Sequence, residues 1–236
     1  MPLSRQLALP FVHLPRLTLD EFLPSAATGP ALAWLARTAD WPGRRLALWG
    51  GAGSGKTHLL HIWATRTGAS LIAGPQLRAE WPPGPIAIDD ADLASHEASL
   101  LHVLNAAHEA GHPVLLAARA PPARWPTRLP DLASRLRATT AVPLGTADDA
   151  FLCTLLARLL SDRQLRVPGP VQEWLLAVLP RDPATLREAA ARLDRATLAA
   201  GRGVDRALAA YALGSLMCED LDTIATDASQ LHPALF

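Results

Sequence analysis

The chain has 236 residues, half of them hydrophobic, and its 22 basic residues balance its 22 acidic residues. This length suffices for one sizeable core, or for one core and a small second lobe. The zero formal net charge excludes a strong long-range attraction to DNA, and no apolar run reaches the roughly 18 residues of a membrane span. We therefore expect a cytoplasmic protein without direct sequence-specific DNA binding and without membrane contact.

The first 146 residues predict an α/β fold. Residues 1–15 contain three prolines and predict an extended segment, after which the folded part begins at residue 16. Short apolar runs then alternate with helical patterns. Strands are expected at 46–49, 70–73, 86–88 and 113–117, and helices at 29–37, 57–67 and 97–110. Such alternation predicts a parallel sheet that is covered on both faces.

Residues 147–213 have a different, purely helical pattern. The helices are expected at 147–163, 170–179, 183–200 and 203–213, with prolines and Gly201 as breaks between them. No strand pattern interrupts this stretch, so we expect a separate all-helical lobe. The role of residues 214–236 stays open.

The most specific motif is a phosphate-binding loop after the first strand. It fits G-x-x-x-x-G-K-[ST] without a mismatch and consists of Gly50, Gly51, Ala52, Gly53, Ser54, Gly55, Lys56 and Thr57. Glycines let the backbone N–H groups turn inward around phosphate, and the following helix presents its N-terminus to the same charge. Lys56 is the only lysine among the 22 basic residues, at the position where a compact ammonium is needed. The alternative is a glycine-rich turn followed by a chance Lys-Thr pair.

The third predicted strand ends in two acidic residues. The run Ile86-Ala87-Ile88-Asp89-Asp90 would deliver Asp89 to the carboxyl edge of the sheet, where it can hold Mg²⁺ together with the Thr57 hydroxyl. Asp90 would lie near an attacking water. The alternative is a strand that ends in ordinary solvated acids.

Several strings resemble the DnaA/Hda family of bacterial AAA+ proteins, and its Hda branch more closely than its initiator branch. They are GKTHLLHIWA at 55–64, IAIDDAD at 86–92, Pro121-Pro122, LPDLASRL at 129–136, LDRA at 193–196, and Thr18 to Pro24, which resembles the family's adenine-packing segment. The resemblance covers roughly residues 5–213. It implies an AAA+ P-loop NTPase module with an α/β base at 16–146 and a helical lid at 147–213, and it implies ADP or ATP with Mg²⁺ on residues 50–58, His58 included.

The same resemblance assigns a role to Arg135. In this family the matching arginine is a finger that reaches the nucleotide of a neighbouring subunit and stabilises charge on its γ-phosphate. The residues by themselves indicate only an arginine on a polar loop after the fourth strand, and an ordinary surface arginine is the alternative.

The N-terminal hexapeptide resembles a motif that docks on the sliding clamp, the β subunit of DNA polymerase III. It comprises Gln6, Leu7, Ala8, Leu9, Pro10 and Phe11. An extended segment fixed by Pro10 can place Leu9 and Phe11 in an apolar pocket, with Gln6 hydrogen-bonded at its rim. The alternative is a first strand or a tail that packs on its own domain.

Two positions depart from the family pattern. Ala118 and Arg119 stand where the family's first sensor has Ser or Gly and then Asp. Ala184 stands where the second sensor has an arginine, although Arg181 and Arg187 flank it. These changes predict weak intrinsic ATP hydrolysis and leave nucleotide binding intact.

The resulting hypothesis is an Hda-like negative regulator of DNA replication initiation that binds the clamp and promotes hydrolysis of DnaA-bound ATP. An initiator would need a further DNA-binding domain, for which the 23 residues after position 213 are expected to be too few. The alternatives are an AAA+ adaptor or helicase-loader-like ATPase, and a nucleotide-binding scaffold that stimulates no ATPase. Homo-oligomerisation stays open.

Overall fold

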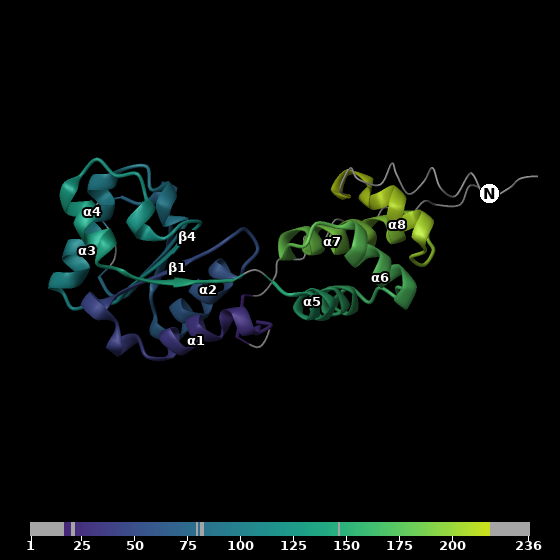
Figure 1. The fold of residues 1–236 in the computed structure, drawn as a ribbon, viewed down its shortest axis with the longest axis horizontal. Helices are drawn as coiled ribbons and strands as arrows, with labels where there is room; N and C mark the ends of the chain where they lie inside the picture. The colour runs from purple at the N-terminus through teal and green to yellow at the C-terminus, as the bar shows by residue number, and fades with distance from the viewer. Residues whose placement is uncertain (1–16, 20–21, 79, 81–82, 146, 218–236) are drawn as a thin grey trace, which may run out of the picture. The chain divides into compact units, whose positions relative to one another are not determined.

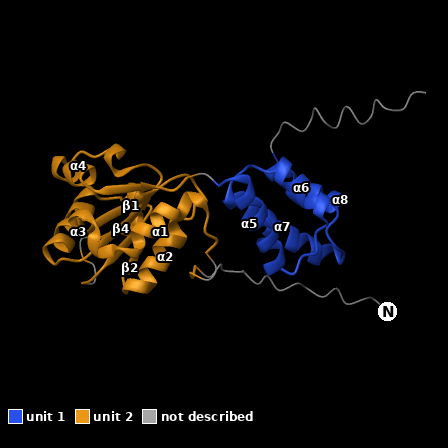
Figure 2. Ribbon diagram, turned by 60° about the horizontal axis from the view of Figure 1, so that its bottom comes forward, with its two compact units in different colours: residues 1–13, 147–236 blue, residues 14–146 orange. Residues whose placement is uncertain are grey.

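The structure is a computed structural model that describes residues 17–19, 22–78, 80, 83–145 and 147–217 (Figure 1). These residues divide into two compact units (Figure 2), an α/β unit within Leu14–Thr146 and a helical unit within Ala147–Phe236. None of the described helices combines the length and the apolar character that crossing a membrane requires.

A five-stranded parallel sheet forms the centre of the α/β unit. Its strands are β1 (Arg45–Trp49), β2 (Ser70–Ala73), β3 (Ile86–Asp89), β4 (Val114–Ala118) and β5 (Thr140–Pro143). They lie in the order β2-β3-β4-β1-β5, with β1 paired to β4 on one side and to β5 on the other. Strands β1 and β4 are central and have almost continuous apolar sequences, as strands covered on both faces require.

Helices cover both faces of this sheet (Figure 1). Helices α1 (Gly29–Ala36) and α2 (Lys56–Thr67) pack with Leu46 and Leu48 of β1 in one buried cluster. On the other face, α3 (Glu97–Glu109) and α4 (Pro130–Arg137) pack in a second cluster that contains Ala47 of β1. Side chains that alternate along β1 therefore enter two different cores.

Tryptophans join α1, α2 and the turn that leads into β1. Trp63 of α2 is fully buried, its ring stacks on Trp41 at 5.3 Å between centroids, and its Nε1 donates to Thr38 Oγ1 at 2.9 Å. Trp41 Nε1 in turn donates to the carbonyl of Trp34 at 2.9 Å. Both indole N–H groups are thus satisfied inside the core, which makes these residues structural.

The helical unit consists of α5 (Asp149–Asp162), α6 (Gly169–Val178), α7 (Pro183–Ala200) and α8 (Arg206–Leu213). Aspartates cap three of these helices, because Asp148, Asp182 and Asp205 each accept backbone N–H groups of the first turn. Short 3-10 helices complete the described fold at Ala26–Thr28, Thr38–Asp40, Pro42–Arg44, Gly74–Gln76, Ala91–Leu93, Pro122–Arg124 and Gly214–Leu216.

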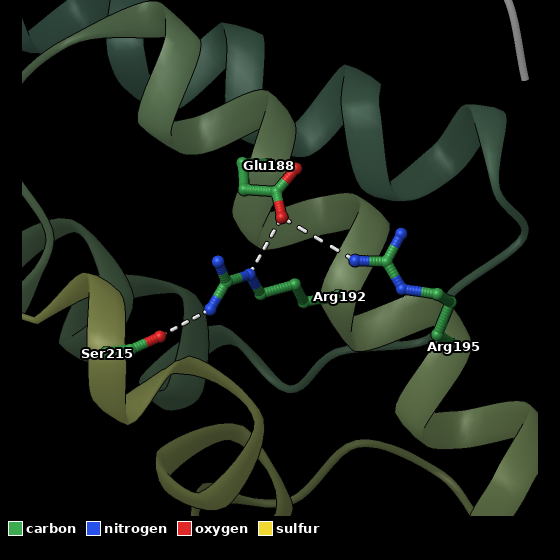
Figure 3. Close-up of polar contacts among 4 residues, drawn as sticks. All are labelled: Glu188, Arg192, Arg195 and Ser215. Atoms are coloured by element: carbon green, nitrogen blue, oxygen red, sulfur yellow. Dashed lines mark hydrogen bonds and ion pairs between the residues drawn. The ribbon is translucent and has the colours of Figure 1, made fainter.

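A polar cluster ties α7 to the turn that follows α8 (Figure 3). The Glu188 carboxylate accepts from Arg192 Nε at 2.8 Å and pairs with Arg195 Nη2 at 3.5 Å. Arg192 Nη1 also donates to Ser215 Oγ at 2.5 Å. The hydrogen bond from Arg192 is the main cause that lowers the pKa of Glu188 below its ordinary value.

The four strands and the helices expected from the sequence are present within a few residues of their expected bounds. Strand β5 and helix α4 were not expected, and the interpretation of Arg135 as part of a polar loop is wrong, because Arg135 lies in α4. Pro130 occupies the first turn of that helix, where proline is favourable, and Leu132 and Leu136 bury one face. The prolines around this segment concealed the helix in the sequence.

Candidate functional site

The phosphate-binding loop connects the carboxyl end of β1 to the N-terminus of α2. Gly55 has a left-handed backbone, with φ at 94°, and is the residue before the first turn of α2. A Cβ at Gly50 would lie 2.6 Å from the carbonyl oxygen of Leu144, so no larger residue fits there. The Gly50 N–H donates to the carbonyl of Ala118 at 3.2 Å, which fixes the loop beside the end of β4.

Lys56 is folded back over this loop. Its side chain is buried, with the residue 8% exposed, and its Nζ donates to the carbonyls of Gly50 at 2.8 Å and Gly51 at 2.7 Å. Burial is the main cause that lowers the pKa of Lys56, and the carboxylates of Asp89 and Asp90 oppose that shift. The loop carbonyls thus take up the N–H donors of Lys56 that a bound phosphate group would otherwise accept from.

Thr57 and Asp89 form the oxygen pair expected for magnesium. Thr57 Oγ1 donates to Asp89 Oδ2 at 2.8 Å, and Asp89 Oδ1 accepts the backbone N–H of Asp90 at 3.0 Å. A hydroxyl and a carboxylate are hard oxygen donors of the kind that Mg²⁺ takes, and it keeps water in its other positions. The residues present therefore fit a magnesium ion beside a bound phosphate.

Asp90 is held in an uncommon conformation. Its φ is 46°, in the left-handed region, which is costly for a residue other than glycine. Gly74 makes room for it, because a Cβ there would lie 2.2 Å from the Asp90 carbonyl oxygen. The close packing against Gly74 holds Asp90 in this conformation at the carboxyl edge of the sheet, directly after Asp89.

Arg119 and Asp92 lie beside the same loop. Arg119 follows β4 with an exposed side chain, and its backbone N–H donates to Asp92 Oδ2 at 3.0 Å. The other carboxylate oxygen of Asp92 is buried and has no hydrogen-bond partner among the described residues. The charges of both residues act on the pKa of Lys56, which Arg119 lowers and Asp92 raises. Asp92 closes the IAIDDAD string at 86–92, but the sequence pattern assigns it no role of its own.

His58 and Phe22 cover the start of α2. The His58 ring nitrogen Nε2 lies 2.7 Å from the carbonyl oxygen of Thr18, and its ring meets Phe22 edge-on at 5.1 Å. Phe22 is also within 3.5 Å of the position that a Cβ of Gly55 would take. Within the segment expected to pack on adenine, Thr18 therefore contacts the start of α2, and the buried ring of Phe22 lies beside Gly55.

Arg135 lies near the opposite edge of the sheet. The hydroxyl of Thr139, the residue before β5, donates to the Arg135 carbonyl at 2.9 Å. The charge of Arg135 also lowers the pKa of Arg45, the first residue of β1, after the larger effect of burial. Since a strand rises about 3.3 Å per residue, about 13 Å of β1 separate Arg45 from the residue before the loop.

Glu97 fixes the segment that leads into α4. Its carboxylate accepts the backbone N–H of Arg128 at 2.9 and 3.1 Å and that of Leu129 at 3.0 Å. Glu97 is itself in the first turn of α3, so α4 is held by hydrogen bonds to a neighbouring helix.

The second-sensor candidates lie at the start of α7 in the helical unit. Ala184 is exposed in the first turn, and Arg181 precedes the helix and pairs with Asp149 at 3.0 Å. Arg187 is half-buried, and burial lowers its pKa against the opposing charge of Asp182. The predicted clamp-binding residues Gln6, Leu7, Leu9, Pro10 and Phe11 lie outside the described residues.

The chain matches no protein-family model and no curated protein sequence. Its structure resembles domain III of the replication initiation protein DnaA from Thermotoga maritima, with a TM-score of 0.72, 19% identity, and coverage of 86% of this chain and 98% of that chain. It resembles a replication initiator DnaA bound to AMPPCP and single-stranded DNA, with a TM-score of 0.61, 16% identity, and coverage of 75% and 64%. It also resembles the RuvB Holliday junction branch migration motor of Thermotoga maritima, with a TM-score of 0.64, 16% identity, and coverage of 92% and 79%.

These similarities establish the fold, which is that of an AAA+ P-loop NTPase. The chain spans slightly less than two thirds of the AMPPCP-bound initiator, and nearly all of the isolated domain III.

Proposed function

We propose that this chain is an Hda-like negative regulator of DNA replication initiation that acts in the cytoplasm. It binds ADP or ATP with Mg²⁺, docks on the sliding clamp, and promotes hydrolysis of the ATP bound to DnaA. The observation that carries this proposal is that the phosphate-binding loop and Arg135 lie toward opposite ends of β1.

Residues 50–58 hold the nucleotide of this chain. Backbone N–H groups of the loop and the N-terminus of α2 surround the phosphates, and Lys56 moves from the carbonyls of Gly50 and Gly51 to the terminal phosphate oxygens. Thr57 and Asp89, which are hydrogen-bonded to each other, would hold the metal ion, and the ion would neutralise phosphate charge. The AMPPCP bound by a DnaA of the same fold supports an adenine nucleotide here.

Hydrolysis of this chain's own nucleotide is expected to be slow. Asp90 lies at the carboxyl edge of the sheet, where it can face an attacking water, but β4 ends in Ala118 and is followed by Arg119. A methyl group has no hydrogen-bonding capacity with which to orient water, and a guanidinium is no acceptor for its proton. The nucleotide would therefore act mainly by stabilising the fold of this chain, as a ligand that binds only the native state does.

Arg135 acts on the nucleotide of a partner. Its helix is near the amino end of β1, about 13 Å of strand away from the loop, so it cannot readily serve its own phosphates. A partner with the same fold presents its phosphates at its own carboxyl edge. An arginine finger placed there is worth on the order of 10³–10⁵ in rate.

The segment Gln6 to Phe11 provides the tether in this proposal. Burial of Leu9 and Phe11 in an apolar pocket yields roughly 3–6 kcal/mol before entropy losses, which is modest for one contact. A ring-shaped clamp with several equivalent sites raises the effective affinity through avidity. The regulator would thus be concentrated where replication has already begun.

The test is the rate at which purified DnaA hydrolyses ATP in the presence of DNA-loaded clamp and this chain. We expect wild type to stimulate, Arg135→Ala to lose stimulation by at least a hundredfold, and Arg137→Ala, an exposed arginine on the same helix, to behave as wild type. Gln6→Ala with Leu9→Ala should abolish both clamp capture and stimulation.

Other results would contradict the proposal in distinct ways. Stimulation that survives Arg135→Ala would exclude the finger. Rapid hydrolysis of ATP by this chain alone, without any effect on DnaA, would favour a helicase-loader-like or motor ATPase. If this chain binds nucleotide but neither it nor DnaA hydrolyses ATP, the chain is a nucleotide-binding scaffold.

A further inference from the structure

A buried arginine without a counter-charge lies beside Arg135. Arg45 is only 8% exposed, and its Nε and Nη1 atoms are buried without any hydrogen-bond partner among the described residues. An unsatisfied buried donor costs free energy, and a buried charge without a partner costs more. Among the described residues, Arg45 therefore keeps an uncompensated positive charge at the start of β1.

The register of the sheet places Arg45 on the face of α4. Side chains alternate along a strand, so Arg45 projects to the same face as Ala47, which packs with Leu132 and Leu136 of α4. Leu46 pairs with Thr140 of β5, which puts Arg45 next to Thr139 across the ladder. The Thr139 hydroxyl holds the Arg135 carbonyl at 2.9 Å, so the two arginines share one small region.

No described acidic residue neutralises this pair. Neither Arg45 nor Arg135 makes an ion pair with a described carboxylate, and Asp131, one helical turn before Arg135, makes none with it either. The arginines that pair with Asp149, Glu188 and Asp205 lie in the helical unit instead. Two cations therefore share the amino edge of the sheet with their charges uncompensated.

We propose that Arg45 and Arg135 form one anion site that takes a phosphate group presented from outside the chain. Arg135 is half-buried on α4, and in this proposal its guanidinium is the group that contacts the phosphate. Arg45 is a positioning residue, because its buried Nε and Nη1 atoms cannot reach a ligand and it acts through its charge. This inference rests on the proposed function where the phosphate belongs to a partner's nucleotide.

The second cation has two effects. Its repulsion keeps the Arg135 guanidinium from settling over the carbonyls at the C-terminus of α4, where cations are otherwise favoured. Its charge also matches the site to a phosphate with two negative charges better than to a carboxylate with one. The pair would thus select phosphate over an acidic side chain of the partner.

The first arm of the experiment measures stimulation of DnaA's ATPase by full-length variants. Arg45→Met and Arg45→Gln should lower the maximal stimulated rate about tenfold with little change in the concentration for half-maximal effect. Arg45→Lys, which keeps the charge, should restore the rate to within about twofold of wild type. Arg44→Met is the matched control, since Arg44 is the exposed preceding residue, and should change nothing.

The second arm measures binding of inorganic tripolyphosphate by calorimetry to the Lys56→Ala chain, whose own phosphate loop is disabled. Binding that disappears on adding Arg45→Met or Arg135→Ala supports a site that also takes free phosphate. Absence of binding, together with the expected loss of rate in the first arm, supports a site that takes only phosphate held by a partner.

The outcomes separate this inference from the proposed function. Full stimulation by both Arg45→Met and Arg45→Gln, with Arg135→Ala inactive, overturns the role of Arg45 and leaves the finger intact. Full stimulation by Arg135→Ala overturns the proposed function. In that case the anion site is supported only if tripolyphosphate binding is lost in both Arg45→Met and Arg135→Ala. Binding that persists in either variant overturns the anion site as well.

Discussion

Replacement of Arg45 by methionine should make the α/β unit more stable. The change removes a buried charge with two unpartnered donors and keeps an unbranched, apolar side chain of similar length in the same space. Each unsatisfied donor costs about 1–3 kcal/mol, and replacing buried ionic groups by apolar ones of similar volume is often neutral or stabilising by about 1–4 kcal/mol. We expect the free energy of unfolding to rise by about 2 kcal/mol.

Urea denaturation followed by tryptophan fluorescence measures this change, because the buried stack of Trp41 and Trp63 reports on the α/β unit. A gain of about 2 kcal/mol corresponds to a rise of roughly 6 °C in melting temperature for a unit of this size. Arg44→Met, at the exposed neighbouring residue, should stay within about 0.5 kcal/mol of wild type. A loss of more than about 1 kcal/mol in Arg45→Met would refute the reasoning, since it would mean that the buried guanidinium has stabilising partners.

Three further predictions concern the loop, its neighbour and the helical unit. Lys56→Ala should weaken the binding of a fluorescent adenine nucleotide by at least about a hundredfold at equilibrium, because no other ammonium lies at the loop. In the same titration, Arg119→Ala should weaken the binding of the triphosphate nucleotide about fivefold more than the binding of the diphosphate. The reason is that the charge of Arg119 lies near the ammonium of Lys56, which meets the terminal phosphate. Equal loss of affinity for both nucleotides would contradict this. Glu188→Gln should destabilise the helical unit slightly at pH 7 and less at pH 3 in thermal melts, because the pKa of Glu188 is lowered in the fold. Its contribution is fully present above the ordinary value of 4.5 and is lost as pH falls through the lowered pKa.

The sequence was sufficient for those parts of the site whose chemistry is local. The loop from Gly50 to Thr57 needs its residue types in a fixed order, and the apolar run before Asp89 is a buried strand in any context. The helix that carries Arg135 was hidden, because the prolines before it suggest a loop when counted along the chain. Its stability comes from Leu132 and Leu136 packing against the sheet, which is a tertiary contact.

Arg45 and Asp92 could not have been singled out from the sequence. An arginine at the start of an apolar strand is usually solvated, and its burial here follows from α4 covering that end of β1. Asp92 belongs to a short 3-10 turn after Asp90, and its link to the backbone of Arg119 joins residues 27 positions apart. The burial of Arg45 and the hydrogen bond of Asp92 both depend on which elements become neighbours in the fold, and a local sequence pattern does not predict this.

The proposed roles of the two ends of β1 have a consequence for assembly. A chain that binds phosphate at the carboxyl edge of its sheet and offers cations at the amino edge can join a protein of the same fold only head to tail, since the two surfaces are different. Such a contact leaves the amino edge, with its cations, free on one protein of the pair and the carboxyl edge, with its phosphate-binding loop, free on the other. A second copy of this chain that pairs in the same way would compete with DnaA for the same cations. Addition of the Arg135→Ala chain, which keeps its own loop, should therefore inhibit stimulation by wild type where the chains pair with one another. Titration of that variant against a fixed amount of wild type, with clamp sites in excess of both chains, measures this competition. Stimulation that stays constant at a large excess of the variant would contradict pairing between copies.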